Sequence, residues 1–137
     1  MDAPDRVLIT DAAAELVARL VARNGPVMFH QSGGCCDGSA PMCYPDGDFI
    51  IGDHDVLLGV LDGGVPVWIS GPQFAVWKHT QVIIDVVPGR GAGFSLEAPE
   101  GMRFLTRSRA FTDAENTVLD DAPVITGASP RPVALPP

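Results

Sequence analysis

One stretch near the start of the chain, residues 10–31, carries the signals of a helix followed directly by a strand; it reads TDAAAELVARLVARNGPVMFHQ. Thr10 suits the N-cap position, because its side-chain oxygen can accept a hydrogen bond from a backbone N–H of the first turn. The apolar residues at helical spacing form one stripe: Leu16, Val17, Leu20 and Val21. Gly25 and Pro26 end the helix, and residues 27–31 then predict a short strand.

The rest of the chain alternates short apolar segments with turn residues, which is typical of strands. We expect strands at residues 49–51, 56–60, 65–69, 81–87 and 93–97, and one or two helical turns at residues 73–79. The Asp62-Gly63-Gly64 turn predicts a hairpin. The pattern therefore predicts an α+β or mainly-β fold, with an N-terminal helix and a strand-rich body in one domain over residues 1–111. Residues 112–137 are expected to form a proline-rich C-terminal extension.

Composition and charge narrow the classes of partner. With 137 residues, 46% of them hydrophobic and 19% charged, the chain fits one ordinary folded domain. A formal net charge of −8 disfavours nucleic acid and anionic membrane as partners. No segment is long and apolar enough to span a membrane, and MDAPDRVLIT lacks the basic start of a signal peptide. We therefore expect a cytoplasmic protein, and we expect its apolar surface to form a homo-oligomer.

All three cysteines of the chain fall within nine positions: Cys35, Cys36 and Cys43. Three cysteines cannot all pair within one chain, and adjacent cysteines rarely bridge each other because the small ring strains the peptide. Thiols also stay reduced in the cytoplasm. A structural disulfide is therefore the weakest of the available interpretations, and a metal site, a reactive thiol or simple packing of small apolar side chains remain.

The glycines around the pair, Gly33, Gly34 and Gly38, let backbone N–H groups approach a bound group or a thiolate. Zinc and ferrous iron accept mixed cysteine and histidine ligands. His30 precedes the loop and His79 lies further along the chain, so both are candidate ligands beside the three cysteines. His54, in an acidic turn, is expected to be solvated. The alternative for each of these side chains is an ordinary structural role.

The helix, the strand and the segment SGGCCDG at residues 32–38 resemble the HesB/IscA-type iron–sulfur carrier proteins. That resemblance implies a compact HesB/IscA-like fold, with Cys35 at the position of the family's first ligand. Carriers of that family have two further cysteines in a late C-G-C motif, and the corresponding segment here, EGMRFLTRSRAF, has none. The departure argues against a conventional iron–sulfur cluster and leaves Cys36 and Cys43 as replacement ligands.

The segment HQSGGCCDGSAPMCYP at residues 30–45 also resembles the hallmark of small bacterial proteins grouped as domain of unknown function 779. This resemblance covers roughly residues 5–115. Members of that family are often encoded beside aldehyde dehydrogenases, which implies such an enzyme as a partner and a role near aldehyde oxidation.

Three functions remain open at this point. The first is a metal- or thiol-dependent accessory protein of aldehyde metabolism, with zinc or iron as the candidate cofactor. The second is a small enzyme in which a metal-bound water or a cysteine thiolate attacks an aldehyde or its thiol adduct. The third is a docking module whose cysteines are structural.

Overall fold

The computed structural model describes residues 3–32, 39–90 and 95–128. The strands of this part of the chain are β1 (Val7–Ile9), β2 (Val27–Gln31), β3 (Met42–Pro45), β4 (Val56–Leu61), β5 (Val65–Ile69), β6 (Thr80–Pro88), β7 (Met102–Ala110) and β8 (Ile125–Thr126). The helices are α1 (Asp11–Asn24), α2 (Gly71–Trp77), α3 (Asp113–Asp120) and the short 3-10 helix η1 (Ala98–Glu100). The predicted α+β class is confirmed.

Helix α1 forms for the reasons visible in its sequence. The Thr10 hydroxyl oxygen accepts a hydrogen bond of 3.2 Å from the backbone N–H of Ala13, which satisfies one free donor of the first turn. Gly25 ends the helix with a φ of 81°, a conformation that side chains disfavour, and its N–H donates to the carbonyl oxygen of Val21. The buried residues of the helix are Ala13, Leu16, Val17 and Leu20.

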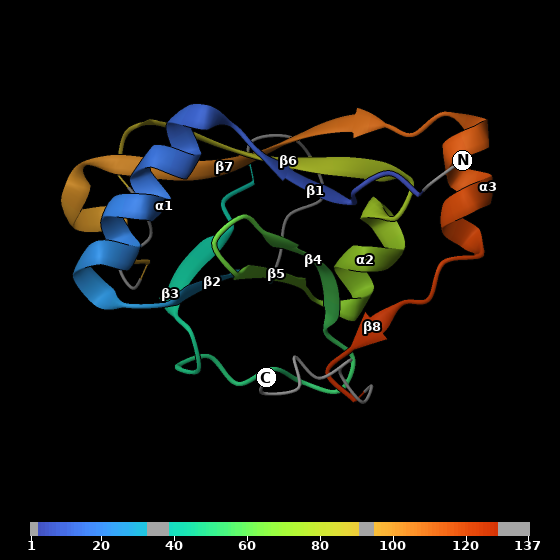
Figure 1. Cartoon of the computed structure of the whole chain (residues 1–137), viewed down its shortest axis with the longest axis horizontal. Coiled ribbons are helices and arrows are strands. Elements are labelled where there is room, and N and C mark those ends of the chain that lie inside the picture. The colour runs from blue at the N-terminus through green and yellow to red at the C-terminus, as the bar shows by residue number, and fades with distance from the viewer. Residues whose placement is uncertain (1–2, 33–38, 91–94, 129–137) are drawn as a thin grey trace.

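The strands form two sheets. One has three strands in the order β1-β6-β7, and the other has five in the order β3-β2-β5-β4-β8. In Figure 1 the three-stranded sheet lies above the five-stranded one, with α1 and α3 at opposite sides. Strands β4 and β5 are antiparallel and joined through the predicted Asp62-Gly63-Gly64 turn, so that hairpin is confirmed. Strand β2 pairs in parallel with β5, and this places the ends of both strands at the same edge.

The core lies between the two sheets and is closed at one side by α1. Phe29 of β2 meets Phe104 of β7 across it, with ring centroids 4.9 Å apart and the rings nearly perpendicular. Such an edge-to-face arrangement is favourable for aromatic pairs. Other fully buried apolar side chains of this core are Leu16, Leu20, Val27, Val67, Ile69 and Ile84.

Three segments differ from the sequence-based expectations. Residues 49–51 are not a strand, because they belong to a loop that covers the outer face of the five-stranded sheet through Phe49. The expected strand at residues 93–97 lies partly outside the described residues, and the described residues from Ser95 form turns that lead into η1. Residues 112–128, within the expected C-terminal extension, contain α3 and β8, which the sequence analysis does not predict.

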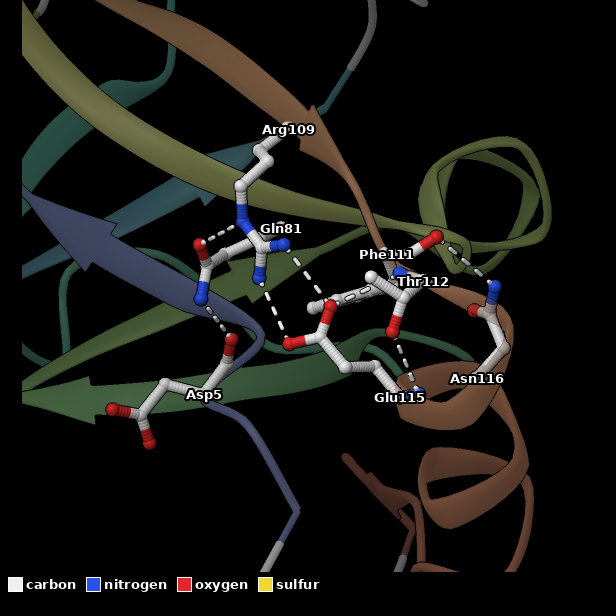
Figure 2. Close-up of polar contacts among 7 residues, drawn as sticks. All are labelled: Asp5, Gln81, Arg109, Phe111, Thr112, Glu115 and Asn116. Carbon is white, nitrogen blue, oxygen red and sulfur yellow. Dashed lines mark hydrogen bonds and ion pairs between the residues drawn. The ribbon is translucent and has the colours of Figure 1, made fainter.

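Helix α3 is fixed to the three-stranded sheet by the polar contacts shown in Figure 2. Arg109 donates two hydrogen bonds of 3.0 Å to the carboxylate of Glu115, and a third, of 3.2 Å, to the side-chain oxygen of Gln81. Gln81 in turn donates to the backbone oxygen of Asp5. Thr112 and Glu115 form a capping box, and the Arg109 hydrogen bonds lower the pKa of Glu115 to about 2.

We expect Thr112→Ala to lower the free energy of unfolding by about 1 kcal/mol, because the helix loses its N-cap acceptor. Denaturant unfolding monitored by circular dichroism measures this change. Thr117→Ala is the matched control in the same helix, since the Thr117 hydroxyl only donates back to the carbonyl of Asp113. Equal losses in the two variants would show that the cap does not stabilise α3.

Candidate functional site

Strand β2 is buried on both faces, and its side chains alternate between them. All five of its residues are buried. Phe29 lies opposite Cys43 of β3 and faces the core, whereas His30 lies opposite Met42 and faces the other side of the sheet. His30 and Cys43 therefore project from opposite faces of the same sheet.

His30 sits in a polar setting in spite of its burial. Only 3% of the residue is exposed. Its Nδ1 is hydrogen-bonded to the hydroxyl oxygen of Ser32 at 2.6 Å, and its Nε2 lies 3.2 Å from the Oδ1 atom of Asp55. The Nε2–Asp55 contact lacks hydrogen-bond alignment, and no residue of the described chain hydrogen-bonds to Nε2. The histidine is thus held at one nitrogen and faces a carboxylate with the other.

Asp55 is positioned by the turn that precedes β4. The backbone N–H of Gly52 donates to its Oδ2 at 2.9 Å, and the N–H of Gly127, just after β8, donates to its backbone oxygen at 2.9 Å. A side chain at Gly127 would place its Cβ 2.0 Å from the backbone oxygen of Gly52, so glycine is required there for β8 to approach the turn. These contacts leave Oδ1 as the carboxylate oxygen directed at His30.

An aromatic pair covers the same histidine. The Phe49 ring packs against His30 in a tilted arrangement at a centroid distance of 4.3 Å, and Tyr44 stacks on Phe49 at 5.0 Å. Together with the sheet beneath, these rings restrict the access of water to the imidazole. The Asp55 side chain is 15% exposed and Ser32 is exposed, so a ligand can reach the imidazole from the end of β2.

Cys43 belongs to the core. It is fully buried, its N–H donates to the Ser95 hydroxyl at 2.8 Å, and its carbonyl accepts a hydrogen bond from the N–H of Leu96. Ser95 also donates to the buried carboxylate of Glu97. Burial, with a smaller contribution from Glu97, raises the pKa of the Cys43 thiol to about 12. A protonated core thiol neither attacks electrophiles nor readily binds metal.

The structure does not bring His79 to this site. His79 is exposed after α2, and its Nδ1 lies 3.3 Å from the side-chain oxygen of Asn116 on α3. His54 is exposed in the turn before β4, as expected. The two adjacent cysteines and the loop glycines lie outside the described residues: Cys35, Cys36, Gly33, Gly34 and Gly38. Within the described ranges no three histidine, cysteine or acidic side chains gather in a way that could hold a metal.

Sequence reasoning missed Ser32 and Asp55. Ser32 lies two residues after His30, so on an extended strand both side chains point to the same side, and that spacing could have indicated the contact. Asp55 is 25 positions from His30 in the numbering, and only the order of the strands brings the two together. Nothing local in GDHD distinguishes Asp55 from Asp53.

Comparison with known proteins places the chain in a family. Residues 16–110, more than half of the chain, match the profile of the family described as domain of unknown function (DUF779), so the chain belongs to that family. No curated protein and no solved structure matches it, and the resemblance to HesB/IscA-type carriers stays a prediction. Among the described helices, none has the length and apolar character needed to cross a membrane.

We expect Cys43 to resist alkylation in the folded protein. At pH 9 an ordinary thiol is largely ionised, whereas Cys43, with its pKa raised to about 12, remains protonated and buried. Iodoacetamide treatment followed by mass spectrometry should modify Cys43 only after denaturation. Modification of Cys43 in the native protein at a rate similar to that in the unfolded chain would contradict its assignment to the core.

Proposed function

We propose that the protein is a metal- or thiol-dependent accessory protein of the cytoplasm, with its site where β2 ends. His30 supplies the proposed nitrogen ligand, Cys35 and Cys36 supply the sulfur, and zinc or iron is the proposed metal. The observation that carries the proposal is the buried His30 side chain, whose Nε2 has no hydrogen bond from the described residues and faces the Asp55 carboxylate at 3.2 Å.

Chain connectivity supports a shared site. Three peptide units separate Ser32 from Cys35, so their Cα atoms are at most about 11 Å apart. Ser32 itself contacts His30 at 2.6 Å. Chain length alone therefore allows Cys35 to reach His30, whereas Cys43 is fixed on the opposite face of the sheet. This is why Cys35 and Cys36, rather than Cys43, are the proposed sulfur donors.

The aldehyde part of the proposal rests on the family resemblance in the HQSGGCCDGSAPMCYP segment. An aldehyde dehydrogenase is the proposed partner, and the protein would supply it with a metal or a reactive sulfur. A thiolate adds readily to an aldehyde carbon, so a sulfur site suits that substrate class chemically.

A small enzyme is the second candidate, and one observation favours it. Ser32, His30 and Asp55 lie in the order hydroxyl, imidazole and carboxylate, which is also the order of a nucleophile, its base and an orienting acid. In that case His30 would have to carry its proton on Nε2 and donate it to Asp55. The Nε2–Oδ1 contact lacks the alignment of such a hydrogen bond, so we rank this candidate second.

We expect about one zinc or iron per chain in protein purified under reducing conditions, measured by elemental analysis. Cys35→Ala should remove most of the metal, because it deletes a proposed thiolate ligand. Cys43→Ala is the matched control, since it deletes a core thiol on the other face of the sheet, and it should keep the metal. Metal-free protein with a thiol of lowered pKa would favour nucleophilic chemistry instead, and absence of both properties would favour the docking module.

A further inference from the structure

The two nitrogens of His30 have different surroundings, and the difference determines where the proton is placed. A neutral imidazole has one N–H donor and one acceptor nitrogen. The Ser32 hydroxyl can serve as donor or acceptor, so it is compatible with either arrangement at Nδ1. The Asp55 carboxylate is acceptor-only when ionised, and the contact to Nε2 is not aligned for an N–H donor. The geometry therefore favours a proton on Nδ1, donated to Ser32.

With the proton on Nδ1, Nε2 carries a lone pair and lies 3.2 Å from the carboxylate oxygen of Asp55, although the lone pair does not point straight at that oxygen. Two electron-rich atoms this close in a buried site are unfavourable unless a proton or a metal cation lies between them, and the contact is not aligned for a shared proton. Ligand bonds of about 2.0–2.2 Å from zinc to nitrogen and oxygen, at angles of roughly 100–110°, separate the two ligand atoms by about 3.1–3.6 Å. The observed distance agrees with that separation.

Both side chains also have the supporting contacts that metal ligands require. The second nitrogen of a ligating histidine is usually hydrogen-bonded, which fixes the tautomer and the orientation of the ring. Ser32 does this for His30 at 2.6 Å. The Gly52 N–H holds the second oxygen of Asp55 at 2.9 Å, so that only one carboxylate oxygen is left for the ion. Phe49 covers the imidazole face and restricts its rotation.

We propose that His30 Nε2 and Asp55 Oδ1 are two ligands of one divalent cation of the zinc or ferrous class. The inference rests on the metal-dependent form of the proposed function and adds a carboxylate ligand to it. An imidazole and a carboxylate suit these ions. The described chain offers no third histidine, cysteine or acid at this point, so the remaining positions belong to other donors or to solvent. A site of this composition binds a single ion rather than an iron–sulfur cluster held by thiolates alone.

Zinc affinity of the full-length, reduced protein, measured by competition with a chromophoric chelator, tests the proposal. Asp55→Asn should weaken zinc binding by about 10-fold or more, because a charged ligand is replaced while the amide oxygen can still accept from Gly52. Asp53→Asn is the matched control, an exposed aspartate in the same turn, and should bind zinc like the unmodified protein. Ser32→Ala should weaken zinc affinity about 10- to 100-fold, as expected for loss of a contact that orients a ligand.

Nitrogen NMR of His30 gives the readout that does not depend on the affinity of any variant. We expect a proton on Nδ1 in the metal-free protein and a shift of the Nε2 resonance when zinc is added. One outcome would overturn this ligand pair while leaving the proposed metal function intact. In that outcome, Asp55→Asn binds zinc as tightly as the unmodified protein, zinc does not shift the His30 resonances, and Cys35→Ala no longer binds zinc. Absence of zinc and ferrous iron binding, with the His30 proton on Nε2, would overturn both.

Discussion

Burial of β2 on both faces is the constraint on which the rest of the structure depends. The inner face, with Phe29, requires the second sheet and α1 to cover it, and Phe104 meets it there. The outer face carries His30, and a buried imidazole needs polar partners. Ser32, directly after β2, supplies a hydrogen bond to one nitrogen, and the loop before β4 brings Asp55 to the other nitrogen and Phe49 over the ring. One strand therefore fixes both the core and the candidate site.

Parallel pairing of β2 with β5 adds the second part of the arrangement. The Ser70 N–H donates to the carbonyl of Gln31, so the ends of the two strands are joined where α2 begins. Strand β4 lies between β5 and β8 in the same sheet. Just after β8, the N–H of Gly127 donates to the carbonyl of Asp55 and so holds the turn before β4. A ligand pair attached to these strands is held more precisely than one on a free loop.

Features coded by neighbouring residues could be predicted from the sequence. Helix α1 has its cap and stripe within fifteen positions, and the β4–β5 hairpin has its turn at Asp62-Gly63-Gly64. Helix α3 was missed although Thr112 and Glu115 have the spacing of a capping box, because weak apolar periodicity conceals so short a helix. The side of the sheet on which Cys43 lies, and the approach of Asp55 to His30, depend on strand order and register. No local sequence pattern contains that information.

The central claim is that His30 and Asp55 meet at a cation, and anomalous X-ray scattering from crystals of the metal-loaded protein tests it most directly. Data collected on both sides of the zinc or iron absorption edge locate the ion without reference to any assumed ligand. The account predicts one peak at about 2.1 Å from both His30 Nε2 and Asp55 Oδ1. A peak bound only by cysteine sulfur, with Nε2 donating a hydrogen bond to Asp55, would contradict it.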